Sequence, residues 1–452
     1  MTSFSALTNA AAALAAQSYG MQITGQNIAN ADTEGYTRER VNEVATGPVP
    51  GVVTLYATSS KTAGTVNALG ASRLNDPLID ARARTQEGLS GYADTAATTM
   101  SDIETNFNEP SDTGLTEQLN SYWKDWSAVA NNPSDSAARS ALLQQANTVT
   151  DTLHSTSSAL SQLETDTQAG LASSVSQINT LAGQVGQLNA QIAVDQATGH
   201  DNPSLSDQRD LLLSKLATLG GAQSQLQPDG TATVTMGGLT LVAGATASTV
   251  AVNGSNLLTV GGTAVTLSSG QAQAQSQALT TTLPGFQASL DAVASKLASD
   301  VNSLHTSGYD LNGNPGGAFF SGATAATISV AITDPTAVAA SATPSASGNL
   351  DNGLATQLAA LGTSTTGADA AYRTLVANVG SASQRATEQS TVQDSVTASA
   401  KSLQASSSGV SYDDEVTNLL TFQRAYQASS RVLTTVDDML DTLINRTGRV
   451  GL

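Results

Sequence analysis

Residues 171–192 have the sequence LASSVSQINTLAGQVGQLNAQI, in which apolar residues recur at every seventh position. Leu171, Ile178, Val185 and Ile192 form this series, and Leu181 and Leu188 lie between its members. A heptad of this kind is typical of a long helix that packs against other helices. The heptad occupies the second half of a helix that we predict from Ser134 to about Asp195. A helix of about 60 residues spans on the order of 90 Å, too long for one globular domain, so the sequence predicts an elongated rod.

Further helices and a β-rich segment account for the rest of the interior. Apolar stripes predict helices near residues 89–107, 115–129, 212–219, 286–304 and 369–406. Short β-branched segments predict strands between residues 231 and 267 and another at 327–332. The expected fold class is α+β, mainly α: an elongated antiparallel helical bundle, or coiled-coil rod, built from both chain ends, with a small inserted β-rich domain. Trp123 and Trp126 lie at helical spacing and are expected in the core.

Both ends of the chain carry an apolar seam in which small residues alternate with large ones. At the N-terminus the seam stops at turn-forming residues around Gly35. At the C-terminus, Ser411 is a predicted N-cap, and the acidic residues 413–415 suit a first helical turn. The large seam residues, which we predict to form an assembly interface, are Phe4, Leu7, Leu14, Met21, Ile28, Val416, Leu419, Tyr426, Leu433, Val436, Leu440 and Leu443.

Neither terminal helix is expected to be stable alone. A large apolar side chain contributes about 1.5–3 kcal/mol when fully buried, and ordering a helix costs a comparable amount. The two seams could pair in an intramolecular hairpin or pack on neighbouring subunits, and the pattern leaves both open. We expect three units. Residues 1–37 with 411–452 form a helical coiled-coil assembly domain, 38–222 with 355–410 a helical rod, and 223–354 an outer β-rich domain with one helix.

Composition excludes several classes of function. The chain has 18 basic and 37 acidic residues, a net charge of −19, so nucleic acid and membrane insertion are not expected. It has no cysteine, which excludes disulfides, thiolate metal sites and thiol catalysis. Residues 10–16 are apolar, but the first basic residue is Arg38, so we expect no cleaved secretory signal.

We predict no catalytic, cofactor-binding or metal-binding residues. His154, His200 and His305 lie on different predicted elements, without the spacing of a metal site. Residues 310–315, DLNGNP, are similar to the start of a calcium loop. However, Pro315 stands where that loop needs Gly, and Ser321 stands where it needs a bidentate Glu. We therefore expect a structural turn there, no cofactor, and no enzyme activity.

Residues 27–38, NIANADTEGYTR, resemble the N-terminal signature of flagellar rod, hook and first hook-associated proteins, which normally have Pro where this chain has Glu34. The motif positions are Asn27, Asn30, Asp32, Gly35 and Tyr36. Five further stretches are similar to the first hook-associated proteins of the hook–filament junction: residues 130–139, 207–210, 305–313, 420–429 and 435–443.

The resemblance implies a structural, self-assembling subunit of the bacterial flagellum that serves flagellum assembly and motility. It implies type III export by an uncleaved N-terminal region, so that the protein is secreted to an extracellular position at the hook–filament junction. There, a ring of identical subunits would sit on the distal hook, with the terminal helices lining an inner tube and the β-rich domain outward. The implied partners are copies of itself, the hook protein, the second hook-associated junction protein and an export chaperone at the C-terminal helix. Two alternatives stay open: another flagellar axial protein (a hook or rod subunit), and a secreted enzyme with coiled-coil ends.

Overall fold

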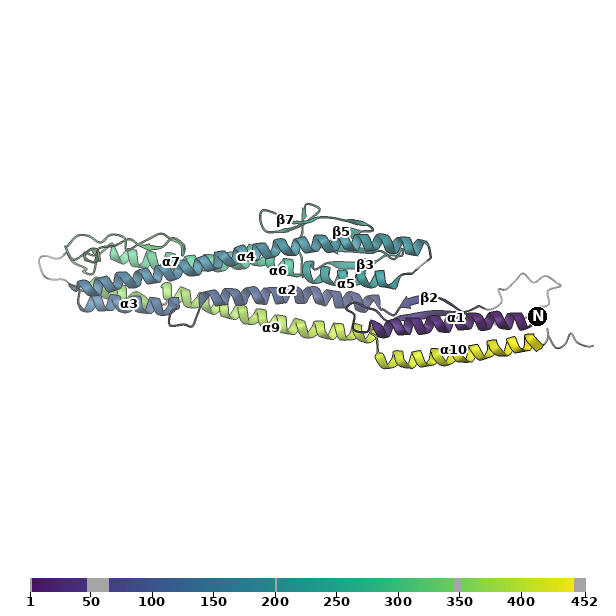
Figure 1. The fold of residues 1–452 in the computed structure, drawn as a ribbon. Coiled ribbons are helices and arrows are strands. Elements are labelled where there is room, and N and C mark those ends of the chain that lie inside the picture. Colours follow the sequence, from purple (N-terminus) through teal and green to yellow (C-terminus); the bar gives the residue numbers. More distant parts are fainter. Residues whose placement is uncertain (1, 47–64, 200, 345–350, 443–452) are drawn as a thin grey trace, which may run out of the picture.

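The molecule is an elongated rod with a narrower pair of helices at one end (Figure 1). In a computed structural model, residues 2–46, 65–199, 201–344 and 351–442 are described. Helix α1 (Thr2–Ala29) and helix α10 (Tyr412–Asp441) lie side by side in this narrow part. Helix α4 (Ser136–Ala197) is 62 residues long and runs along the rod. The prediction of an elongated, mainly helical bundle with a β-rich insertion is confirmed.

The other helices of the rod form an antiparallel bundle with α4. Their bounds are α2 Pro77–Phe107, α3 Leu115–Asn131, α5 Pro203–Gly220, α6 Gln271–Gln277, α7 Leu283–His305, α8 Gly353–Ala360 and α9 Ala368–Ser408. Helix α4 contacts α2, α3, α5, α6 and α7, whereas α8 packs mainly on α3 and α9 mainly on α2. Short helical turns at Ala278–Thr282, Pro335–Ala337 and Leu361–Thr363 adjoin them. Local chemistry sets where the helices begin. The carboxylates of Asp76, Asp135 and the hydroxyl of Ser411 each accept a hydrogen bond from a first-turn amide of α2, α4 and α10.

The inserted β-rich segment forms two small antiparallel sheets on the flank of α4. One contains β3 Gln223–Leu226, β4 Ala232–Met236, β5 Leu239–Ala243 and β6 Thr246–Ala247, and the other β7 Val250–Val252, β8 Leu258–Val260 and β9 Thr263–Ala264. Two asparagines of α4 fasten the sheets. The amide of Asn189 bonds both the N–H and the C=O of Ala232 at 2.9 and 2.8 Å. Asn179 does the same for Val250, at 2.8 Å each way. A buried amide that satisfies two backbone groups fixes where each sheet sits on the helix.

An aromatic cluster fills the core at the end of the rod far from the termini. Trp126 is fully buried and Trp123 nearly so, as predicted, and both contact the ring of Tyr122 or Phe319. A two-stranded sheet, β10 (Phe320–Ser321) and β11 (Ser329–Val330), lies beside them. His305 is also buried here.

One hairpin was not predicted. Strands β1 (Glu39–Thr46) and β2 (Thr65–Arg73) pair antiparallel and lie along α1. The residues between the two strands, 47–64, are too many for the short turns that identify hairpins in a sequence.

Candidate assembly site at the base of the terminal helices

Helices α1 and α10 pack against each other along a buried stripe of α1 that includes the small residues Ala16 and Gly20. Ala16, Gly20, Ile23 and Asn27 follow one another at steps of four and three, and all are buried. Gly20 lies against Phe422 of α10, so closely that a Cβ at this position would be 2.6 Å from the ring. Asn27, seven residues on, bonds Glu415 of α10. The terminal helices thus form an intramolecular hairpin, the first of the two possibilities that the pattern left open.

The predicted seam on α1 lies on a neighbouring stripe. Met21 and Ile28 are each one residue beyond Gly20 and Asn27, which turns them by about 100° around the helix, and Leu7 and Leu14 continue their stripe at seven-residue steps. Each of these four side chains is only half-buried. The side chain of Phe4 lies outside the described part of the chain, as does Leu443.

On α10 the inner face follows the second half of the predicted seam. Leu433, Val436 and Leu440 are half-buried and continue, at helical spacing, the face of Glu415 and Phe422. Phe422 was not among the predicted seam residues, although its ring lies on this inner face against Gly20.

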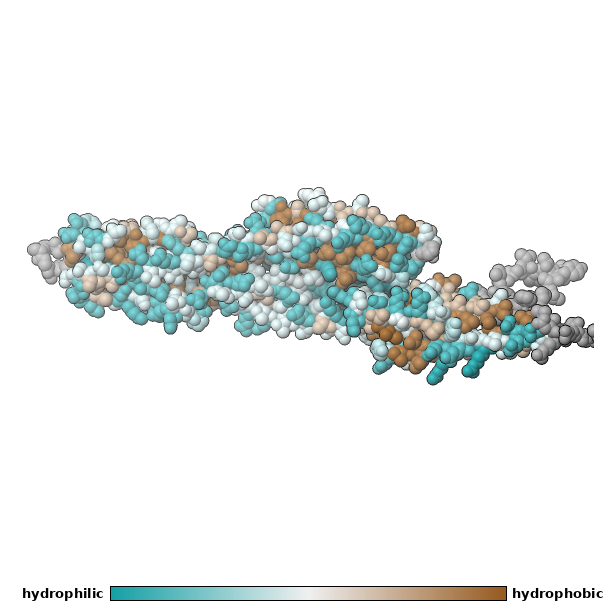
Figure 2. All heavy atoms as spheres, in the orientation of Figure 1, coloured by the Kyte–Doolittle hydropathy of each residue, from teal (hydrophilic) through white to brown (hydrophobic). Residues whose placement is uncertain are grey.

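The remaining seam residues of α10 lie beside that face. Val416 and Leu419 are half-buried, and Tyr426 is exposed. Other large apolar residues of α10 are also exposed, namely Leu420, Val432 and Met439. Figure 2 shows hydrophobic residues gathered at this end of the molecule, near the start of α10 and along α1. The hairpin therefore leaves much of its apolar surface uncovered.

A buried polar network joins the hairpin to the rod, and Asn27 is its centre. The Asn27 amide donates to the Glu39 carbonyl at 2.9 Å and to Glu415 Oε2 at 3.0 Å. Its oxygen accepts the Glu39 N–H at 3.0 Å and the Tyr36 hydroxyl at 2.8 Å. One side chain thereby uses four hydrogen bonds to fix the end of α1, the turn after it, strand β1 and the start of α10.

Arg38 pairs with the buried end of Glu415. Its Nε and Nη2 lie 2.7 and 2.6 Å from Glu415 Oε1, and its Nη1 lies 3.8 Å from Asp414. The Arg38 backbone also bonds Ser408 at the end of α9 and Leu74 after β2. Glu415 was predicted only as a favourable first-turn acid. In the structure its carboxylate is buried and holds two chain segments 377 residues apart.

A second charged cluster anchors the same turn to α5. Arg73 lies 2.7 Å from both Asp207 and Asp210, although its contact with Asp207 lacks hydrogen-bond geometry. Asp207 also accepts the Thr37 N–H at 3.1 Å. Arg209 pairs with Asp210 at 3.0 Å. Residues 207–210, which the sequence distinguished only by their resemblance, thus supply the carboxylates that bond Thr37 and Arg73.

Burial and charge act against each other in this cluster. Burial opposes the charge on Arg73, but Asp210 and Asp207 outweigh it and raise the pKa of Arg73. Burial likewise opposes ionisation of Asp210, yet Arg209 and Arg73 hold its pKa below the usual value. Burial raises the pKa of Asp207 despite Arg73. Burial and the nearby Asp207 also raise the pKa of Glu39. Two carboxyl groups with raised pKa values, Glu39 and Asp207, therefore lie where the hairpin meets the rod.

The other motif residues shape the turn. Gly35 has a φ of 80°, a left-handed conformation that favours glycine, and it lies against Leu211 of α5. Asn30 bonds Gln26 one turn back, at 3.0 Å, and is the acceptor for Thr33. Asp32 is exposed. The motif thus combines a buried anchor, Asn27 with Tyr36, and a tight turn.

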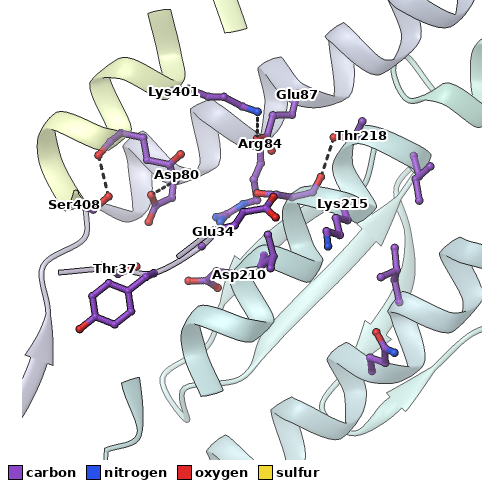
Figure 3. Close-up of a pocket in the computed structure, with 18 of the residues that line it drawn as sticks. Glu34, Thr37, Asp80, Arg84, Glu87, Asp210, Lys215, Thr218, Lys401 and Ser408 are labelled. Atoms are coloured by element: carbon purple, nitrogen blue, oxygen red, sulfur yellow. Dashed lines mark hydrogen bonds and ion pairs between the residues drawn. The ribbon is translucent and has the colours of Figure 1, made fainter. Parts of the chain in front are cut away.

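A groove of about 940 Å³ opens beside this cluster. Figure 3 shows side chains of α2 (Asp80, Arg84, Glu87), α5 (Asp210, Lys215) and α9 (Lys401) converging on it. Its walls also include the half-buried leucines Leu181, Leu211 and Leu219. Lys401 pairs with Glu87 at 3.0 Å, and Gln404 donates to Asp80 at 2.7 Å.

The residues considered for metal binding have other partners. Asp310 Oδ1 accepts the N–H groups of Asn312 and Asn314 at 2.8 Å each, which is the geometry of a capped turn. His154 bonds the Ile328 carbonyl and His305 the Gly317 carbonyl, while His200 lies outside the described residues. Within the described ranges there is no group of three or more metal-ligating side chains, and no helix is long and apolar enough to span a membrane.

Comparison with known proteins assigns the family. Flagellar hook-associated protein 1 of Bacillus subtilis is 30% identical over an alignment that covers 100% of both chains. The chain belongs to the flagellar hook-associated protein 1 family. A family model described as the flagellar hook-associated protein FlgK helical domain matches residues 100–320. Models described as flagella basal body rod protein and flagellar basal body rod FlgEFG protein C-terminal match residues 7–37 and 403–446.

A second curated relative and a solved structure are also similar to this chain. Flagellar hook-associated protein 1 of Salmonella typhimurium is 29% identical over 70% of this chain and 59% of its own length. The solved flagellar hook junction protein FlgK of Burkholderia pseudomallei shares the fold, with a TM-score of 0.64 and 19% identity over 73% of this chain and 100% of that one. Family membership makes the chain a structural flagellar protein of the hook–filament junction, and it does not favour a hook or rod subunit.

Proposed function

We propose that this hook-associated protein forms a ring of identical subunits on the distal hook and that the filament attaches above it. Its partners would be copies of itself, the hook protein, the second hook-associated junction protein, and an export chaperone that covers the C-terminal helix before secretion. Export would use the type III channel and an uncleaved N-terminal region. The role is structural, without catalysis.

One observation carries the proposal: the heptad stripe Leu7, Leu14, Met21 and Ile28, which lies beside the α10 contact and is only partly buried. α10 packs on the adjacent stripe, through Gly20 and Asn27. A heptad of large apolar residues is the pattern that a second helix needs for close packing. In a monomer each side chain of this stripe keeps part of its apolar surface in solvent, so we assign the stripe to contacts with helices of neighbouring subunits.

The predicted division into units serves this role. Residues 1–37 with 411–452 would be the assembly domain, with Phe4, Val416, Leu419, Tyr426 and Leu443 extending the interface. Residues 38–222 with 355–410 would be the rod and 223–354 the outward domain. We amend one boundary of this division. Because the β1–β2 hairpin lies along α1, it would belong to the assembly domain and not to the rod.

The test is complementation of a strain that lacks this gene. That strain should keep its hooks and shed filament protein into the medium, whereas bare rods without hooks would indicate a rod or hook subunit. Leu14→Asp and Met21→Asp should prevent incorporation at hook tips, seen by immunogold labelling, without separating α1 from α10. Gln22→Asp, at the exposed neighbouring position, is the matched control and should assemble normally.

Leu433→Asp and Leu440→Asp test the other face. These changes place charge against α1, so they should abolish incorporation by opening the hairpin while the β-rich domain stays folded. Normal labelling of hook tips with the Leu14 and Met21 variants would contradict the role of the outer stripe.

A further inference from the structure

An exposed apolar row follows one face of α9. Val392, Val396 and Leu403 are 60%, 40% and 45% exposed. Their spacing of four and seven residues places them within a narrow arc of the helix and over a length of about 16 Å. The residues one position later, Gln393 and Thr397, are buried and bond Gln86 of α2. Across the described ranges, no other helix covers this row.

The groove beside α5 lies on the other side of the same helix. Its α9 lining is Lys401, Gln404, Ala405 and Ser408. Leu403 and Ala405 are two residues apart, so the row and the groove face in roughly opposite directions from α9. The groove wall offers three half-buried leucines, Leu181, Leu211 and Leu219.

Row and groove occupy the same level along the rod. Gly91 of α2 lies against Thr218 of α5, and Gln86 of α2 lies against Gln393 and Thr397 of α9. The α5 segment from Leu211 to Leu219 therefore runs beside the same part of α2 as the α9 segment from Val392 to Leu403. Copies that stand in parallel around an axis would bring the row of one to the groove of the next without a large axial shift.

Charge also favours these two surfaces as a contact between copies. The whole chain carries −19, so identical subunits repel one another over most of their surface. The groove instead has four cations and four acids among its lining residues: Arg73, Arg84, Lys215 and Lys401 against Glu34, Asp80, Glu87 and Asp210. The row itself has no charged side chain, and the charged residues of its segment, Asp394 and Lys401, lie on the opposite side of α9, where both bond α2. Two neutral patches are thus available where like-charged copies can approach.

We infer that the α9 row of one subunit inserts into the α2–α5–α9 groove of its neighbour. Row and groove are different surfaces, so the contact is head-to-tail, the type that closes into rings or continues as a helix. The inference rests on the proposed function, since it requires parallel copies, and it names a second interface in addition to the terminal helices.

The absence of native cysteine allows a direct test. Val396→Cys and Leu219→Cys are made separately and together, and assembled flagella are treated with a short bismaleimide. A mixture of the two single variants should give crosslinked dimers, the double variant a ladder of higher multimers, and each single variant alone monomers. Val194→Cys, also exposed and apolar but on α4, replaces Val396→Cys in the control mixture, which should stay monomeric.

Three results would overturn the inference: no dimer from the mixture, dimers from Val396→Cys alone (a symmetric contact), or equal dimers in the control. A second measurement applies if crosslinking alters assembly. Val392→Glu with Val396→Glu should lower incorporation at hook tips at least tenfold, whereas Val194→Glu leaves it unchanged; equal incorporation would also refute the contact. If the cysteine variants restore filament attachment but give no crosslinks, this interface is refuted while the proposed junction function still stands.

Discussion

Asn27 gives the sharpest test of how the terminal hairpin is held to the rod. Its side chain makes four hydrogen bonds of 2.8 to 3.0 Å, to Glu39 (twice), Glu415 and Tyr36, in a site where it is 1% exposed. A hydrogen bond contributes about 1 kcal/mol net, and a buried partner left unsatisfied costs about 1–3 kcal/mol. In Asn27→Ala, Glu415 still pairs with Arg38 and is not left without a partner. We therefore expect the free energy of opening the hairpin to fall by about 3 kcal/mol.

Hydrogen exchange measured by mass spectrometry can locate this loss. The hairpin packs mainly through its two helices, so it should open as a local unit. A loss of about 3 kcal/mol corresponds to amide exchange on the order of 100-fold faster in α10, because every 1.4 kcal/mol is tenfold. Amides of α4, far along the rod, should exchange as before.

Two variants make the result interpretable. Asn30→Ala removes a solvent-exposed bond to Gln26 in the same motif and should change exchange by less than about threefold. Asn27→Asp keeps the volume but removes the donors and sets a carboxylate against Glu415, so it should be at least as disruptive as Asn27→Ala. Equal exchange in the Asn27→Ala and Asn30→Ala variants would refute the central role of Asn27.

Two further predictions concern the rod. His305 Nδ1 donates to the Gly317 carbonyl and Nε2 accepts the Ala339 N–H, both at 2.7 Å, and burial lowers the pKa of this imidazole. The neutral ring stabilises the fold above the unfolded-state pKa of about 6.5. That contribution should disappear as the pH falls below this value. Between pH 7.5 and 5, the melting temperature of His305→Gln should therefore depend less on pH than that of the unmodified protein. Gly91→Ala should destabilise by about 1–3 kcal/mol, since its Cβ would lie 2.4 Å from the Thr218 carbonyl oxygen. A Cβ at Gly183 would meet no atom within 4 Å, so Gly183→Ala should instead stabilise the protein by up to about 1 kcal/mol. Urea unfolding measures both variants, and a change of stability of the same sign in both would contradict the packing.

The sequence by itself determined the helices, the rod and the family. The heptad from Leu171 to Ile192 requires a long helix whatever the chain does elsewhere, because its period is a local property. The strands after residue 231 were likewise found from β-branched residues and intervening turns, and β4, β5, β7 and β8 lie where they were predicted. The motif at residues 27–38 indicated a flagellar axial protein before any contact was known.

Only the tertiary structure decided which stripe of α1 meets α10. Hydrophobicity favours the stripe of Leu14 and Met21, but the contact uses Gly20, whose missing side chain lets the Phe422 ring approach. Asn27 and Glu415 are 388 residues apart, and no local period connects them. Close packing of small residues and long-range polar pairs depend on the relative placement of distant segments, which propensity and spacing do not encode. For that reason the sequence predicted the helices at both ends, while their register and their buried anchor came from the fold.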